Sequence, residues 1–212
     1  MGPAESDESL IGYWKMDENN GSIAEDSSMY DNNGALRGNP VWRPSSGKFD
    51  GAIELDGLGD PAEISGFSLT GDTATFTAWV NCYQTVPWAG IVYSSSGLAC
   101  GMHYENVNHL RYTWNDNNVV TWGWNSGLTI PGNEWVFVAL VIQPDRARLY
   151  TYADSTGLQE VEHDLPNMMQ TLDNLKIGWD SQSSDRYFHG MIDEVRIYQR
   201  ALLREEILDL IL

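Results

Sequence analysis

The chain has 212 residues and a formal net charge of −18 at pH 7, from 30 acidic and 12 basic side chains. This excess of negative charge argues against binding to the phosphate backbone of nucleic acids or to an anionic membrane surface. Apolar residues make up 42% of the sequence, which is enough for a sizeable core. No stretch approaches the roughly 20 apolar residues of a membrane-spanning helix, so we expect no membrane insertion.

Residues 1–9 are polar, and we expect them to be a disordered or expression-derived tail, with one domain over 10–212. After this tail, short apolar segments alternate with clusters of Gly, Asn, Asp and Pro, the pattern of β-strands joined by turns. About fourteen such strands favour an all-β fold, a large two-sheet antiparallel sandwich. They are predicted at 10–16, 34–37, 52–55, 62–64, 74–82, 90–94, 99–104, 109–114, 119–124, 135–143, 146–152, 160–163, 174–177 and 189–199.

Two cysteines, Cys82 and Cys100, fall at core-facing positions of their predicted strands. They form one disulfide between neighbouring strands or stay as buried thiols, and the sequence leaves both alternatives open. No C-x-x-C pair is present, so neither a redox site nor a zinc site is predicted.

The last strand, at 190–198, alternates with period two, which places Met191, Asp193, Val195 and Ile197 on one face. Asp193 is thus expected in line with apolar side chains, where a lone carboxylate is costly to desolvate. A bound cation is one solution, and the N–H groups of a loop backbone are another.

One short helix is predicted at the C-terminal end of the chain. Leu203, Ile207, Leu210 and Ile211 repeat at helical spacing, and acidic residues occupy the first turn. We expect this apolar stripe to dock on one end of the sandwich.

Several segments follow one another in an informative order: GYWKMDE at 12–18, DSS at 26–28, NGAL at 33–36, GAIELDG at 51–57, ATFTAWV at 74–80, EWVFVAL at 134–140 and FHGMIDEVRIY at 188–198. Together they resemble the laminin-G-like, concanavalin A-like jelly-roll family. The resemblance covers nearly the whole chain and fades between Trp88 and Trp124. It implies a two-sheet jelly-roll with a short C-terminal helix, in a secreted or cell-surface protein.

The resemblance also implies a structural Ca²⁺, because members of this family often tie an N-terminal loop to the last long strand through calcium. Carried over by position, Asp193 is one ligand, and Asp17 and Asp26 are its acidic partners. Backbone carbonyls would complete an oxygen shell of about six to eight ligands. The alternative is that the acidic residues of 17–33 are turn formers, as Asp and Asn often are.

A catalytic site is not predicted. The same jelly-roll hosts glycan hydrolases, whose paired carboxylates come from an E-x-D-x-E strand, and this pattern is absent. Glu160, Glu162 and Asp164 imitate it most closely, but we expect them on a solvated edge strand. No His lies beside a Ser or Cys nucleophile in the sequence.

The middle of the chain is rich in aromatic residues. Two consecutive strands at 109–114 and 119–124 are expected to form an aromatic ladder across one sheet. These rings either fill the core or stack on the apolar faces of sugar rings, with side chains such as Asn115 supplying polar contacts. The candidate ligand-binding residues are Trp88, Trp114, Trp122, Trp124, Trp179 and Asn115.

We therefore expect a non-catalytic, lectin-like recognition module, with a glycan as the first candidate ligand. An extracellular protein ligand, as in an adhesion module, is the first alternative. A structural appendage of a larger secreted enzyme is the second, and an unrecognised glycan hydrolase or lyase is the third. Fold resemblance alone does not decide between these functions.

Overall fold

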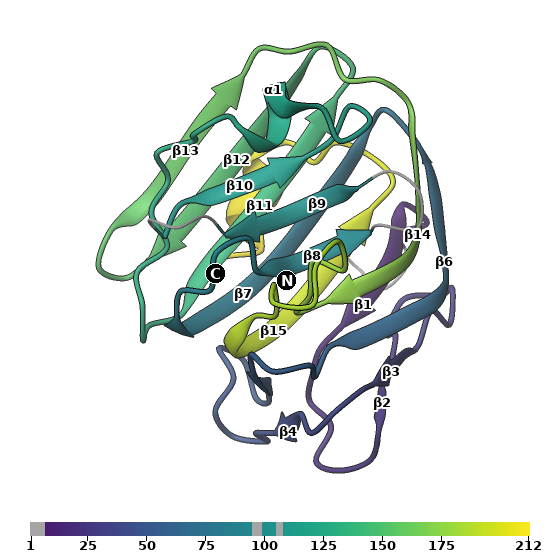
Figure 1. The fold of residues 1–212 in the computed structure, drawn as a ribbon, viewed down its shortest axis with the longest axis vertical. Coiled ribbons are helices and arrows are strands. Elements are labelled where there is room, and N and C mark those ends of the chain that lie inside the picture. Colours follow the sequence, from purple (N-terminus) through teal and green to yellow (C-terminus); the bar gives the residue numbers. More distant parts are fainter. Residues whose placement is uncertain (1–6, 95–98, 105–107) are drawn as a thin grey trace.

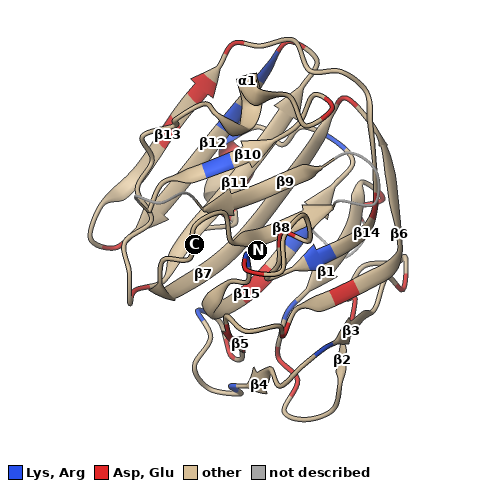
Figure 2. Ribbon diagram, viewed as in Figure 1, with Lys and Arg blue, Asp and Glu red and all other residues tan. Residues whose placement is uncertain are grey.

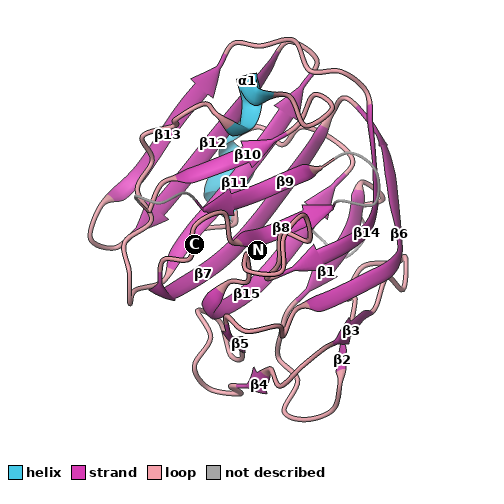
Figure 3. Cartoon of the chain, in the orientation of Figure 1, coloured by secondary structure: helices cyan, strands magenta, loops and turns pink. Residues whose placement is uncertain are grey.

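A computed structural model describes residues 7–94, 99–104 and 108–212. Within these residues the chain forms two antiparallel sheets that lie face to face, together with two short helices (Figures 1 and 3). The predicted all-β jelly-roll sandwich with a short C-terminal helix is confirmed.

The first sheet contains β1 (Leu10–Trp14), β4 (Val41–Trp42), β5 (Ile53–Asp56), β7 (Ala74–Gln84), β11 (Val136–Gln143), β12 (Arg146–Ala153), β13 (Gly157–His163) and β15 (His189–Tyr198). Its order is β13–β12–β11–β7–β15–β5–β4, and β1 also pairs with β15. The second sheet contains β2 (Ile23–Ala24), β3 (Gly34–Leu36), β6 (Ala62–Gly71), β8 (Gly90–Ser94), β9 (Cys100–Tyr104), β10 (Leu110–Thr113) and β14 (Gln170–Ile177). Its order is β10–β9–β8–β14–β6–β3–β2.

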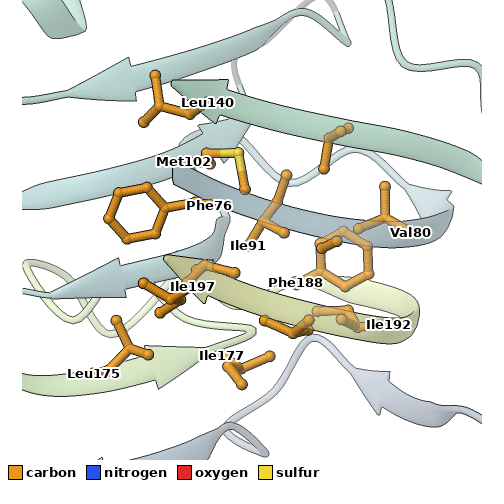
Figure 4. Close-up of a cluster of buried hydrophobic side chains, with 14 of the residues drawn as sticks. Phe76, Val80, Ile91, Met102, Leu140, Leu175, Ile177, Phe188, Ile192 and Ile197 are labelled. Atoms are coloured by element: carbon orange, nitrogen blue, oxygen red, sulfur yellow. The ribbon is translucent and has the colours of Figure 1, made fainter. Parts of the chain in front are cut away.

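The main core lies between the two sheets. Aliphatic and aromatic side chains from both sheets meet there, including Phe76, Met102, Leu140, Ile177 and Ile192 (Figure 4). These side chains are almost fully buried, and each buried Leu, Ile, Phe or Met contributes roughly 1.5–3 kcal/mol relative to an exposed one. Burial of one face of each strand explains the period-two pattern of the sequence.

A second apolar cluster covers the outer face of the first sheet. Helix α2 (Arg204–Asp209) contributes Ile207 to this cluster, where it joins Trp79, Phe137 and Tyr198. The backbone N–H of Leu203 donates to the Glu206 carboxylate at 2.7 Å, which stabilises the helix start. The predicted helix is confirmed, but it packs on a sheet face instead of an end of the sandwich.

The segment 119–124 was expected to be a strand, and this prediction is wrong. Val119–Trp122 forms a helical turn, α1, which begins at Asn118. The Asn118 side chain accepts a hydrogen bond from the N–H of Val120 at 3.1 Å, and this N-cap overrides the strand preference of Val119 and Val120. The expected aromatic ladder between two consecutive strands is therefore absent.

The face of β15 that carries Asp193 also differs from the prediction. Glu194 and Val195 together oppose one residue of β7, and Glu194 has φ 53°, which is a β-bulge. The bulge inverts the alternation, so Val195 and Ile197 face the core between the sheets while Asp193 pairs across the sheet with Trp79 of the outer cluster. Asp193 is fully buried there.

Both cysteines are buried free thiols, which excludes the disulfide alternative. Residues 1–6 of the predicted tail lie outside the described residues, whereas Asp7 forms an ion pair with Arg200 at 2.9 Å. In the part of the chain that the structure describes, no helix is long and apolar enough to cross a membrane.

Candidate functional site

The outer face of the second sheet carries a hollow of about 240 Å³ above β8, β9 and β10. Its floor is formed by Tyr93, His103 and Thr113, which alternate with core residues such as Met102. Gly101 pairs with both Tyr93 and Thr113 in the strand register, and it contributes no side chain to fill the floor between them. All residues of these three strands are buried, so other segments cover their outer face.

Three connections form the walls of this hollow. One precedes β8, one contains α1, and one joins β14 to β15 and crosses β8 in Figure 1. The wall residues are Trp88 from the first, Asn117 and Trp122 from the second, and Asp180, Gln182 and Arg186 from the third.

The Trp88 ring is held in place by the wall and the floor. Its centroid lies 5.4 Å from that of His103 and 5.8 Å from that of Trp122, with the two indoles at 76°. Trp88 has φ 64°, a left-handed conformation that costs an ordinary residue roughly 1–2 kcal/mol. Strain of this kind persists where the surrounding contacts impose it, and it concentrates at functional sites.

The connection between β10 and α1 has an unusual backbone. Asn115, Asp116 and Asn117 are consecutive left-handed residues, with φ of 53°, 62° and 57°. Asn and Asp tolerate this region better than other residues with side chains, which explains why the sequence reads N-D-N here. The turn directs Asn117 toward the hollow, and its carbonyl accepts the indole N–H of Trp122 at 3.1 Å.

The third wall depends on a close backbone contact at Gly90. A Cβ atom at this position would lie 2.4 Å from the backbone N of Asp180, so only glycine allows the connection to approach the sheet. The Gly90 N–H donates to the carbonyl of Arg186 at 3.2 Å. Asp180 is 1% exposed, and its carboxylate accepts from Arg186 Nη1 at 2.7 Å and from the Gln182 N–H at 3.0 Å.

The His103 imidazole is neutral. Its Nδ1 lies 3.3 Å from the carbonyl of Tyr104, which can only accept, so Nδ1 carries the proton and Nε2 accepts from the Thr113 hydroxyl at 3.1 Å. Burial lowers the pKa of His103 to about 4, since the charged form would be desolvated. The hollow therefore combines aromatic rings, hydroxyl groups, a neutral imidazole and one ion pair.

Only two of the six predicted ligand-binding residues come together at this hollow, Trp88 and Trp122. Trp114 has no exposed surface, and its indole N–H donates to the carbonyl of Met168 at 2.9 Å, so the prediction of Trp114 as a ligand contact is wrong. Asn115 is 5% exposed and accepts from the Met168 N–H at 2.7 Å; it holds two connections together and is not among the residues that line the hollow.

The remaining two predicted residues lie outside the hollow. Trp124 stacks on His163 at 4.3 Å between centroids, with 6° between the rings. Trp179 stacks on Tyr187 at 5.0 Å and donates its indole N–H to the carbonyl of Ser183 at 2.9 Å. Both rings are half-buried and occupied by intramolecular partners.

Several wall and floor residues were not found from the sequence. The parity of the strand at 99–104 places His103 opposite the core residues, and this was the available signal for the floor. Asp180 and Arg186 pair within the connection between β14 and β15, and no local sequence pattern predicts this ion pair. The missed residues are Tyr93, Thr113, Asp180, Gln182 and Arg186.

The predicted calcium ligands do not all converge. Among the described residues, no group of three or more His, Cys, Asp or Glu side chains is placed to hold a metal ion, and acidic residues are spread over strands and connections (Figure 2). The Asp26 carboxylate accepts from the N–H groups of Tyr13, Ser28 and Asn32 and from the Ser28 hydroxyl. Its acceptor capacity is used, so Asp26 organises the turn and does not fit as a ligand.

Asp193 and Asp17 fit a cation better. Asp193 Oδ2 accepts from the Phe49 N–H at 3.0 Å, whereas Oδ1 is buried with no hydrogen-bond partner. Asp17 Oδ1 accepts from the Gly51 N–H at 2.8 Å, on the same loop. The loop amides thus satisfy one oxygen of each carboxylate. Of the three predicted calcium ligands, Asp193 and Asp17 remain candidates and Asp26 does not.

The acidic strand that imitates a hydrolase motif carries ion pairs instead. Glu162 pairs with Arg146 at 2.9 Å and with Arg148 at 2.6 Å, and Glu160 pairs with Arg204 at 2.7 Å. These side chains are exposed or half-buried on the edge strand β13. At the hollow, Asp180 is the single carboxylate among the described lining residues, so the two-carboxylate arrangement of glycoside hydrolysis is not formed there.

Comparison with known proteins gives one family and several similar folds. The family model described as the concanavalin A-like lectin/glucanases superfamily matches residues 56–208. No curated protein matches the chain. Domain 4 of AbnA, an extracellular GH43 arabinanase from Geobacillus stearothermophilus solved with arabinotriose, aligns with TM-score 0.68 and 18% identity over 95% of this chain and 97% of that one.

Two further structures have the same fold. Trypanosoma rangeli sialidase in complex with sialic acid aligns with TM-score 0.63 and 15% identity over 99% of this chain, which spans 33% of the sialidase chain. The binding domain of Paraclostridial Mosquitocidal Protein 1 aligns with TM-score 0.64 and 13% identity, over 94% of this chain and 51% of that one. Because the family model covers most of the sequence, the chain belongs to the concanavalin A-like lectin/glucanases superfamily.

Proposed function

We propose that the chain is a non-catalytic carbohydrate-binding module whose ligand site is the hollow over β8, β9 and β10. The observation that carries this proposal is the pair of partly exposed indoles, Trp88 and Trp122, set at 76° around a floor of polar groups. Sugar rings present apolar C–H faces beside hydroxyl groups, so they need an aromatic surface and nearby hydrogen-bonding side chains together. The volume of about 240 Å³ is below the roughly 300–1,000 Å³ of common small-molecule pockets, which suits one sugar ring.

The comparisons support this proposal without deciding it. The family is described by lectins and glucanases, and one similar structure was solved with arabinotriose. The alignments with the sialidase and with the mosquitocidal protein cover only part of those chains, as expected for a module within larger proteins. We therefore also propose that this module works outside the cell, attached to or beside a glycan-active protein.

A structural Ca²⁺ at Asp193 and Asp17 is part of the proposal. When bound, it would supply positive charge to the unpartnered oxygen of Asp193 and fix the loop at 47–51 against β15. The hollow lies over the other sheet, so sugar binding does not require the ion to contact the ligand.

The test is binding of the purified chain to a glycan array, followed by tryptophan fluorescence titration with the oligosaccharides that bind. We expect Trp88→Ala to weaken binding about tenfold, because an aromatic contact contributes up to about 1.5 kcal/mol and a tenfold change in affinity corresponds to about 1.4 kcal/mol. Trp42→Ala is the matched control, since Trp42 is a half-buried indole on β4 of the other sheet; its binding should equal that of the unmodified chain. Absence of binding to every glycan would favour the protein-binding or appendage alternatives, whereas full binding by Trp88→Ala would place the sugar site outside the hollow.

A further inference from the structure

One wall of the hollow carries a charge-neutral ion pair. The Asp180 side chain is 2% exposed, and Arg186 Nη1 lies 2.7 Å from its Oδ2, so each charge compensates the other. The other lining groups are uncharged: two indoles, a phenol, amides, a hydroxyl and the neutral imidazole of His103. The lining as a whole therefore presents no net charge to a ligand.

A neutral sugar suits this wall better than an acidic one. Its hydroxyl groups can donate to the remaining lone pairs of Asp180 and accept from Arg186, and hydrogen bonds to charged groups are stronger than those between neutral groups. A carboxylate placed beside Arg186 would also lie beside Asp180. It would lose its hydration without a net electrostatic gain, and burying an uncompensated charge is unfavourable.

The net charge of the whole chain also disfavours acidic sugars. Its formal net charge of −18 repels anions during their approach. Arg186 also lies over the Trp88 ring, with its guanidinium carbon 5.6 Å from the ring centroid. The guanidinium is thus fixed between a carboxylate and an aromatic ring, and it is poorly placed to turn toward an anionic ligand.

We propose that the hollow selects neutral sugars and rejects those that carry a carboxylate, and that the Asp180–Arg186 pair determines this choice. This inference rests on the proposed carbohydrate-binding function.

The experiment compares matched oligosaccharides that differ only in CH₂OH or COO⁻ at C6, such as glucose- and glucuronate-terminated or galactose- and galacturonate-terminated pairs. We expect the neutral member of the pair that binds to be favoured at least about tenfold, with affinity nearly independent of salt concentration. Equal or tighter binding of the acidic member overturns this inference and leaves the carbohydrate-binding function standing. Binding of no member overturns both.

Asp180→Asn isolates the ion pair, because the amide can keep the hydrogen bond from the Gln182 N–H while Arg186 loses its counter-charge. We expect the preference for the neutral member to fall about tenfold or to reverse. Asp185→Asn is the matched control: it removes the same charge from an exposed position in the same connection, and the preference should not change. An unchanged preference in Asp180→Asn contradicts the proposal.

Arg186→Gln gives a second result that does not depend on the folding of the first variant. It leaves Asp180 without its cation. The affinity for neutral sugars should therefore fall, and the affinity for acidic sugars should fall even more. Melting temperatures of all three variants identify any loss of folding. A gain in affinity for the acidic sugar in Arg186→Gln would contradict the assigned role of the pair.

Discussion

The outer faces of the two sheets each carry an ion pair with a buried carboxylate beside an aromatic ring, and the two pairs differ in what surrounds them. Over the second sheet, Asp180 and Arg186 border a hollow with partly exposed indoles. Over the first sheet, Glu194 and Arg196 contact Tyr13, whose hydroxyl donates to Glu194 at 2.9 Å. Tyr13, Glu194 and Arg196 line a second depression, which has a volume of about 500 Å³ and is therefore larger than the hollow.

Chemistry, and not size, separates the two faces. The Tyr13 ring is covered by cations: Arg196 lies 4.1 Å and Lys15 5.5 Å from its centroid. Arg196 also donates to the Tyr13 hydroxyl at 2.8 Å, so the polar groups of this cluster are used within the chain. A buried charge pair that satisfies itself stabilises a fold, whereas the Asp180–Arg186 pair borders a hollow with two partly exposed indoles, where we propose that a sugar binds.

Removing the cation from the self-satisfied cluster should have the largest effect on stability. Arg196→Met leaves Glu194 buried without its counter-charge, and such losses cost about 3–5 kcal/mol in the free energy of unfolding. Urea denaturation measures this cost. Sugar binding at the opposite sheet should be unchanged.

The control for this variant is Arg37→Met, because Arg37 pairs with Glu63 while 59% of its side chain is exposed. It should lose less than about 1 kcal/mol. Similar losses in both variants would show that burial does not distinguish the two pairs.

Calcium should stabilise the first sheet and leave the second sheet unaffected. An ion at about one hundred times its dissociation constant adds about 2.7 kcal/mol to the free energy of unfolding, so EDTA should lower the melting temperature. Asp193→Asn should abolish the EDTA response, whereas Asp26→Asn should keep it because Asp26 is occupied by N–H donors. A melting temperature that EDTA does not change would mean that the loop amides alone satisfy Asp193.

The contrast also explains what the sequence could and could not reveal. Strand periodicity and the ordered family segments were sufficient to predict the sandwich, because a strand with one buried face has an apolar residue at every second position. They failed at Glu194, where a bulge inverts the alternation, and at Asn118, where an N-cap converts a strand-like segment into a helical turn. Trp88 was found because Pro87 marks a turn, but the partnership of Asp180 with Arg186 depends on how a connection folds over Gly90.

The floor of the hollow should make the protein sensitive to acid. Burial lowers the pKa of His103 from 6.5 to about 4, so the unfolded chain takes up a proton first as pH falls. The groups that face this imidazole are Tyr93, Thr113, Arg186 and Arg111. The contribution of neutral His103 to the free energy of unfolding is complete above pH 6.5 and is lost as pH falls toward 4. The loss amounts to about 2 kcal/mol at about pH 5.

Urea denaturation at two pH values measures this loss. His103→Gln can keep both hydrogen bonds without a titrating group, and its stability should fall about 2 kcal/mol less than that of the unmodified chain between neutral pH and about pH 5. His109→Gln, at a half-exposed position bonded to Asn125, is the control and should keep the full acid sensitivity. Equal pH dependence in all three proteins would show that His103 is not held neutral.

The smallest effect concerns strain at Trp88, and it separates stability from binding. Its φ of 64° suits glycine, so Trp88→Gly should be more stable than Trp88→Ala by about 1 kcal/mol, although both lose the same ring contacts with His103 and Trp122. Both should lose sugar binding to the same extent. Calorimetric melting and fluorescence titration measure the two quantities on the same samples. Equal stability would mean that the backbone of this wall is relaxed. Higher stability of the glycine variant together with lost binding would show that the chain tolerates strain at Trp88 in order to hold an indole over the hollow.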